Sequence, residues 1–267
     1  MAVNTQREDR LQAYLDKMSE LLLTGNLRKS GLNDEARYIA RARTLTVLSQ
    51  LDGDGERKKT VLQFLYESNL IKKNEDSNIV SLEGANLSDG DYSIMNLQNA
   101  NLHKVFMLKA TLDSMDLSGA DISDAELSDS NFADSNLSCS NLRETYIQDA
   151  RLENTDLHNA DMSHTHLTGA DLTNANLSGA NLTGANLGSF LSEDGNYYRS
   201  AANLTNANLS TAILIDANLT ETNLTGANLS KADLRGANLT KAKVTEEQWK
   251  KAKSLKGAIM PDGSKHP

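Results

Sequence analysis

A five-residue period runs through most of this chain, from Val80 to Val244, with one interruption. Leu or another apolar residue occupies every fifth position, a small residue such as Ala lies two positions before it, and Asn or Asp stands between them. The register holds over 22 units centred on Leu82–Leu187 and over 9 more centred on Leu204–Val244. Because one such unit cannot bury its own apolar face, successive units must stack on their neighbours. The period therefore predicts a solenoid that presents a surface.

The positions within one unit have distinct environments. If the small residue, the polar residue and the central apolar residue form an extended triplet, the first and third point inward and the second points outward. The last two residues of each unit are rich in Ser, Thr, Gly and Asp, which suit a tight turn. Neither a period of 3.6 nor a period of 2 describes this pattern, which excludes ordinary helices and long strands for the repeat.

The consensus A-[DN]-L-x-x, as in Ala175-Asn176-Leu177-Ser178-Gly179, resembles the pentapeptide-repeat family. The resemblance covers about 165 of the 267 residues. It implies a mostly β fold, a right-handed quadrilateral β-helix with four pentapeptides in each coil. The 31 units would then make about eight coils.

The segment before the repeat is of another kind, and the sequence predicts an α-helical domain of about three helices over residues 1–77. Apolar residues at three- and four-residue spacing indicate an amphipathic helix over Arg7–Leu23. A second helix is expected after Asn33, a good N-cap residue, and a third over Val61–Leu70. The arrangement is similar to the N-terminal extensions of some cyanobacterial pentapeptide-repeat proteins. The β-helix is expected to span residues 78–245.

The C-terminal residues 246–267 are predicted to form a cap helix and a tail. Thr245 is suited to begin a short helix, with two glutamates in its first turn. We expect Trp249 to close the last coil, since the open end of a solenoid exposes apolar core and unpaired strand edges. Some family members dimerise through that end, so a homodimer contact is the alternative for this segment.

Charge is unevenly distributed along the chain, whose formal net charge is −9. Residues 1–79 carry 13 Lys/Arg and 12 Asp/Glu, residues 80–245 carry 9 and 21, and residues 246–267 carry 5 and 3. The repeat is thus acidic, which argues against direct binding of nucleic acid. Some family members mimic DNA and bind type II topoisomerases, so DNA mimicry is one interpretation of this acidity. The alternative is that outward Asp and Asn only keep the rod soluble.

The interruption of the repeat spans residues 190–201 and contains a turn signal, so we expect a projecting loop. It carries three aromatic residues in a chain otherwise poor in them, namely Phe190, Tyr197 and Tyr198. Tyr is favoured at interfaces, which makes this loop a candidate partner-binding segment. The alternative is that these rings pack back on the rod.

With four units in each coil, residues 20 apart would stack on one face. One outward row then reads Asn86, Phe106, Glu126, Tyr146, His166, Asn186. Since this position is elsewhere nearly always small and polar, Phe106, Tyr146 and His166 are candidate contact residues. Folding of the N-terminal helices over Phe106 and the adjacent Leu108 is the alternative that the sequence leaves open.

Catalytic and cofactor motifs are not visible in the sequence. His158, His164 and His166 lie close together in the chain, but at positions that should differ in direction, and they lack the spacing of a zinc site. No phosphate loop or nucleophile elbow is present, and a convex rod offers no deep pocket. We therefore expect a non-enzyme without catalytic residues, metal or cofactor.

The chain has no apolar run long enough for a membrane span, and its N-terminus lacks a signal-peptide core. These features favour a cytoplasmic protein that does not bind membranes. The function expected from the sequence is a scaffold or regulator that binds a protein partner. The alternative function is a DNA-mimicking modulator of a type II topoisomerase such as gyrase.

Overall fold

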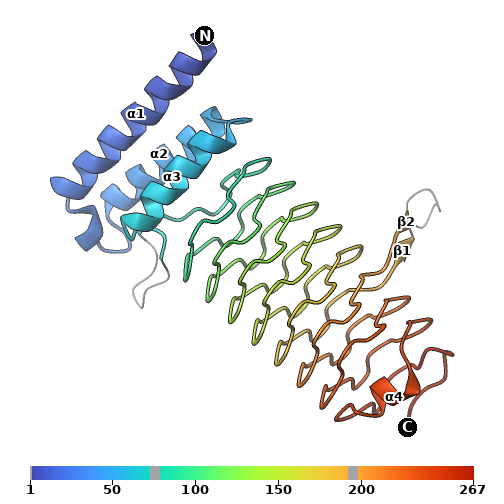
Figure 1. The fold of residues 1–267 in the computed structure, drawn as a ribbon. Coiled ribbons are helices and arrows are strands. Elements are labelled where there is room, and N and C mark those ends of the chain that lie inside the picture. Colours follow the sequence, from blue (N-terminus) through green and yellow to red (C-terminus); the bar gives the residue numbers. More distant parts are fainter. Residues whose placement is uncertain (1, 73–78, 192–197) are drawn as a thin grey trace.

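The computed structural model describes residues 2–72, 79–191 and 198–267. It consists of a group of helices followed by a repeat β-helix, in which most coil segments are too short to count as strands (Figure 1). The named elements in chain order are α1 (Ala2–Leu23), the short 3-10 helix η1 (Leu27–Lys29), α2 (Glu35–Gln50), α3 (Gly55–Glu67), β1 (Phe190–Leu191), β2 (Tyr198–Arg199) and α4 (Glu246–Trp249).

Parallel bridges between residues 20 apart hold the rod together, so four pentapeptides make one coil. In one such step, the Leu127 amide donates to the Tyr146 carbonyl at 2.7 Å and the Tyr146 amide donates to the Ala125 carbonyl at 2.9 Å. The spacing increases to 32 residues only where the interruption lies, as between Asn186 and Asn218. The coils therefore stay in register across the inserted segment.

Each pentapeptide turns a corner by the same local chemistry. In one unit the Ala160 amide donates to the Leu157 carbonyl at 3.1 Å, and Asn159 between them has a left-handed φ of 56°. The outward Asn or Asp caps the turn, as where the Asn136 Oδ1 accepts from the Ser138 amide at 3.1 Å. Gly, Asn and Asp are enriched at turns because they tolerate positive φ or bond their own backbone. This explains the polar alternation of the sequence.

Ile94 breaks that rule, because a β-branched residue there adopts a φ of 58° with 82% of its side chain exposed. Replacing Ile94 by Asn should raise the free energy of unfolding by about 1 kcal/mol, since Asn tolerates this conformation and little packing is lost. Urea unfolding of the two proteins measures the change. The reciprocal substitution Asn159→Ile, at an equivalent turn, should lower it by a similar amount. A destabilised Ile94→Asn variant would contradict the strain argument.

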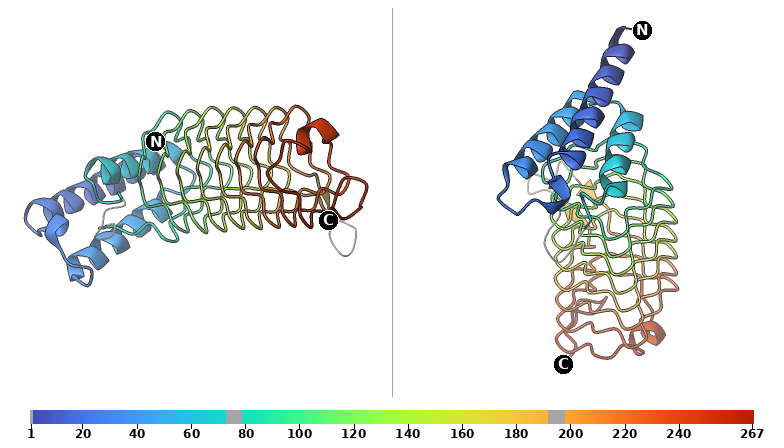
Figure 2. Two further views of the ribbon diagram at one scale, coloured as in Figure 1. Left: turned by 90° about the horizontal axis from the view of Figure 1, so that it is seen from below. Right: turned by 90° about the vertical axis from the view of Figure 1, so that its left-hand side faces the viewer.

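The N-terminal helices lie across one end of the rod and do not run along its sides (Figures 1 and 2). α2 and α3 lie nearer the first coil, and α1 packs on their outer side. The segment after α3 joins the coil edge, with the Val80 amide donating to the Leu70 carbonyl at 2.8 Å and the Asn101 amide donating to the Ile71 carbonyl at 2.6 Å. Buried apolar side chains form one continuous core from Leu11 to Met260. The helices and the rod thus share a single core.

Polar contacts fix the helices on this end of the rod. The Tyr66 hydroxyl donates to the Asn96 Oδ1 at 2.9 Å, and the Lys59 Nζ donates to the Ser93 carbonyl at 3.2 Å. Gly55, the first residue of α3, lies against the backbone of Gly90 in the rod. A Cβ added at Gly55 would lie 2.9 Å from the Gly90 Cα. A side chain at this glycine would push the helix away from the coil.

At the other end, α4 takes the place of one pentapeptide. Gln248 completes a capping box with Thr245 and donates from Nε2 to the Leu224 and Ala227 carbonyls at 2.7 and 2.9 Å. The chain then continues the rod, with Ile259 bridging Asn238. Trp249 is half-buried against the core. The closing role expected for Trp249 stays a prediction.

Over residues 2–72, 79–191 and 198–267, none of the helices combines the length and the apolar character that a bilayer crossing requires.

Candidate protein-binding surface

Four side chains of unusual type stack on one face of the rod. Bridges link Phe106 to Glu126, Glu126 to Tyr146, and Tyr146 to His166, one coil apart at each step. We call Phe106, Glu126, Tyr146 and His166 the aromatic ladder. The Tyr146 and His166 rings are stacked, with centroids 4.4 Å apart and an interplanar angle of 7°. The row expected from the repeat register is thus formed in the structure.

The aromatic ladder is open to solvent. Phe106 is 42% exposed and Tyr146 38% exposed, and the neighbouring Leu108 is exposed as well. The N-terminal helices do not cover this face, because they lie across the end of the rod (Figure 2). Of the two arrangements that the sequence left open, the structure has the uncovered one.

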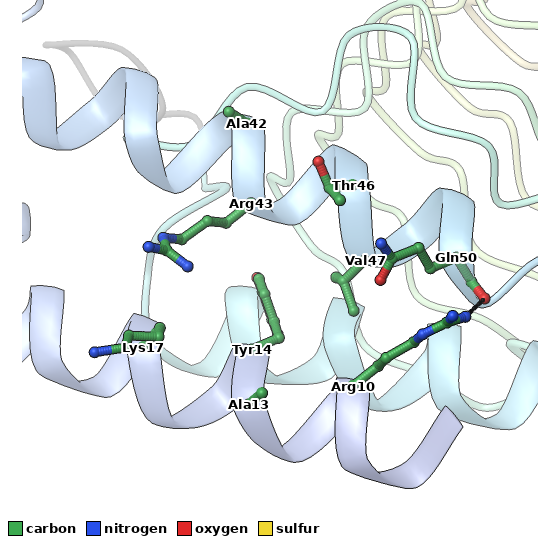
Figure 3. A pocket seen from close by; sticks show the side chains of 9 residues that line it. All are labelled: Arg10, Ala13, Tyr14, Lys17, Ala42, Arg43, Thr46, Val47 and Gln50. Carbon is green, nitrogen blue, oxygen red and sulfur yellow. Dashed lines mark hydrogen bonds between the residues drawn. The ribbon is translucent and has the colours of Figure 1, made fainter. Parts of the chain in front are cut away.

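A shallow hollow of about 520 Å³ lies between α1 and α2 (Figure 3). Its lining residues are Arg10, Ala13, Tyr14, Lys17, Ala42, Arg43, Thr46, Val47 and Gln50. Tyr14 and Val47 are buried at its floor, and the Tyr14 hydroxyl lies 3.0 Å from the Thr44 Oγ1. Burial raises the pKa of Tyr14 well above its usual range, so this hydroxyl stays protonated. Lys17 at the rim is paired with Glu20 at 2.7 Å. Sequence reasoning missed this hollow, because it exists only where the two helices pack together.

A second hollow, of about 380 Å³, lies beside the aromatic ladder. Its lining residues are Asp124, Glu144, Tyr146, His164 and His166. The Asp124 carboxylate lies 3.6 Å from the His103 Nδ1. Within the described part of the chain, no Lys, Arg or His nitrogen lies within 4.0 Å of the Glu126 or Glu144 carboxylate. The ladder is therefore bordered by carboxylates that can accept a cation.

The interruption of the repeat forms a β-hairpin at its base, where the sequence predicted only a loop. β1 and β2 are antiparallel, with Phe190 opposite Arg199 and Leu191 opposite Tyr198. The hairpin leaves the rod directly after the column that contains the ladder, and the Ala202 amide donates to the Leu187 carbonyl at 2.8 Å where the coil resumes. Inserted residues can pair with each other there because both ends of the insertion meet at one corner of the coil.

An ion pair holds the hairpin to the rod, and several apolar side chains of its described residues are exposed. The Arg199 Nε lies 3.3 Å from the Asp149 Oδ2 two coils away. Phe190 and Tyr198 are exposed, and the Tyr198 hydroxyl donates to the Glu221 Oε2 of the rod at 3.5 Å. Leu191 is also exposed, and the sequence reasoning missed it, although an apolar residue in a polar insertion was a usable signal. Tyr197 lies outside the described residues.

The three histidines that lie close together in the sequence fall into two groups. His158 contacts Asp156 of its own pentapeptide, with Nδ1 and Oδ1 2.9 Å apart, on another face of the rod. His164 and His166 line the hollow beside the ladder. In residues 2–72, 79–191 and 198–267, no three or more His, Cys, Asp or Glu side chains are placed to hold a metal ion.

The net negative charge of the rod lies in its first half. Residues 80–171 hold 16 Asp/Glu and 4 Lys/Arg, whereas residues 172–245 hold 5 of each. The aromatic ladder lies within the acidic half. The excess of carboxylates therefore does not extend along the whole rod.

Repeated short coils with a continuous aliphatic core and functional groups on the outer faces define a solenoid of the repeat-protein class. The family profile described as "Pentapeptide repeats" matches the chain in eight copies. The matched ranges are residues 96–134, 116–154, 125–163, 150–188 and 202–240. The chain belongs to the pentapeptide-repeat family.

Solved structures include several similar proteins. A trypsin-treated form of QnrB1, a plasmid-mediated fluoroquinolone resistance protein, is 15% identical, with 68% of this chain and 86% of that chain covered and a TM-score of 0.57. HetL, involved in heterocyst differentiation regulation in Nostoc sp. strain PCC 7120, is 28% identical, with 78% and 98% covered and a TM-score of 0.28. The pentapeptide-repeat protein alr5209 from Nostoc is 35% identical, with 37% and 69% covered and a TM-score of 0.30. The likeness to QnrB1 is one of fold. A comparison with curated proteins finds no match.

Proposed function

We propose that this protein is a non-catalytic scaffold or regulator that binds a protein partner through the aromatic ladder and the hairpin. One observation carries the proposal: the exposed ladder leads along one face of the rod to a hairpin with exposed apolar residues. Apolar groups gathered on a surface are typical of contact sites, and aromatic residues supply much of the binding energy at interfaces.

In this role the protein acts in the cytoplasm. It uses no cofactor and binds neither membranes nor nucleic acid directly. Pairing of two copies would use the C-terminal end near Trp249, where a hollow is lined by this ring, Met260 and Pro261.

The second candidate function is DNA mimicry against a type II topoisomerase such as gyrase. The acidic half of the rod favours it, as does the fold likeness to QnrB1, described as a plasmid-mediated fluoroquinolone resistance protein. The neutral half, residues 172–245, limits the length of duplex that the rod could imitate. Mimicry predicts binding that weakens steeply with salt, whereas binding through the aromatic ladder should depend only weakly on it.

Deleting residues 190–201 tests the proposal, because the shortened chain joins Gly188 and Ser189 directly to Ala202 and restores an unbroken pentapeptide register. We expect the circular dichroism spectrum to stay unchanged and the thermal midpoint to equal or exceed that of the intact protein. The amount of partner captured from cytosol should fall by about tenfold or more. Contributions of a few kcal/mol from interface aromatic residues give this magnitude. Quantitative mass spectrometry of the captured proteins measures the loss.

Asp116→Asn is the matched control, since it changes an outward residue on a different face and keeps the oxygen that accepts from the Ser118 amide. It should capture the partner as well as the intact protein does. If the hairpin deletion and a Phe106→Ala, Tyr146→Ala variant both retain the partner, the proposed surface is wrong. Capture of a topoisomerase with steep salt dependence would put the second candidate first.

A further inference from the structure

The order of residues in the aromatic ladder places Glu126 between two aromatic residues. Glu126 bridges Phe106 on one side and Tyr146 on the other, each one coil away. Bridged segments lie about 4.8 Å apart, which is within the range of centroid separations for stacked rings. Glu126 is half-buried in this row. A partner group that fits here must satisfy a negative charge and lie against an aromatic face.

Within the described residues, the charged groups around the ladder leave the Glu126 carboxylate without an ion-pair partner. Three basic residues on nearby corners are already paired, namely Lys104 with Glu83, Arg143 with Asp161 and Arg199 with Asp149. Lys109 lies at the corner after Phe106, in the turn column that also holds Asp129 and Asp149. On the other side, Asp124 and Glu144 line the hollow beside Tyr146. The surface of the ladder thus carries an excess of carboxylates, two of which, Glu126 and Glu144, have no ion-pair partner within the described residues.

The guanidinium group of arginine meets these requirements better than other side chains. It is planar, it stacks on aromatic faces, and its fork of donors matches a carboxylate in a bidentate way. The ammonium group of lysine is a strongly hydrated point charge, so it gains the charge attraction but not the stacking. An apolar side chain would leave Glu126 desolvated without a partner, which is costly.

We propose that the aromatic ladder is a binding site for arginine side chains of the partner, with the guanidinium stacked on Tyr146 or Phe106 and paired with Glu126. This inference rests on the proposed function, because it names the chemistry of the partner on the same face. A partner segment with arginines spaced along an extended stretch could engage successive rungs.

Two labelled peptides of equal charge test this inference on the full chain, one with six Gly-Ser-Arg repeats and one with six Gly-Ser-Lys repeats. Fluorescence anisotropy at two salt concentrations measures their dissociation constants. We expect the arginine peptide to bind about fivefold more tightly than the lysine peptide. This factor corresponds to the free energy that stacking of a guanidinium on an exposed aromatic ring contributes. Tyr146→Ala and Glu126→Gln should each remove most of this preference. Tyr146→Phe keeps the ring and should retain it.

Asp116→Asn again serves as control, because it removes one carboxylate from another face and should leave the preference unchanged. Circular dichroism checks that each variant is folded. Equal affinity for the two peptides would overturn the inference, as would absence of binding or a preference that survives Tyr146→Ala and Glu126→Gln. If native partner capture still depends on Tyr146 while no arginine preference is found, the proposed function stands and only the arginine chemistry fails. If capture depends on neither Tyr146 nor the hairpin, the proposed function itself fails.

Discussion

Replacing Phe132 by Ala is expected to lower the free energy of unfolding by about 3–5 kcal/mol, as truncation of a fully buried aromatic ring does. Phe132 is 1% exposed and occupies a central position in the middle of the rod. Its outward neighbour Asn131 bridges Thr111 in the coil before and Arg151 in the coil after. The smaller side chain leaves a cavity that stacked coils cannot close without breaking these bridges. Because each coil contacts only its neighbours, a loss in the middle weakens two coil interfaces.

Urea unfolding followed by circular dichroism measures this change, with Asn131→Asp as the matched control. Asn131 is adjacent to Phe132 but points outward, and its Oδ1 accepts from the Ala133 amide at 3.2 Å, a bond that an aspartate oxygen can also accept. The control should change the unfolding free energy by no more than about 0.5 kcal/mol. A loss below about 1 kcal/mol for Phe132→Ala would show that the core relaxes far more than a close-packed interior does.

Removing residues 2–67, which comprise α1, η1, α2 and α3, is expected to produce larger associated species than the intact protein forms. The helices and the first coil share one core, in which Leu62 and Leu65 of α3 and Val80 and Leu82 of the coil are all buried. Truncation would expose that apolar end together with unpaired backbone groups, which promote end-to-end association. Size-exclusion chromatography with light scattering measures the change in mass.

Deletion of the hairpin residues 190–201 is the matched control for this truncation, because it also shortens the chain but opens no part of the core. The hairpin deletion should have the same association state as the intact protein. A truncated rod with the association state and the thermal midpoint of the intact protein would contradict the shared core.

The sequence by itself determined the repeat and much of the candidate surface. A strict five-residue period assigns each side chain to the core, the outer face or a turn, since a shift of one position would expose leucines and bury charges. With four units in each coil, which the family resemblance supplied, that register also placed Phe106, Tyr146 and His166 in one row. The structure has the same row. Local sequence signals likewise indicated the capping role of Thr245.

The tertiary structure alone decided how segments outside the repeat are arranged. The position of α2 and α3 at the end of the rod, which leaves Phe106 uncovered, depends on contacts such as that of Tyr66 with Asn96, 30 residues apart. The hairpin pairs because the coil brings both ends of the insertion to one corner, and the hollow between α1 and α2 exists only after the helices pack. Such contacts join segments without a common period. The five-residue period therefore determines the structure of the repeat. The arrangement of the helices and the hairpin depends on packing between surfaces that share no period.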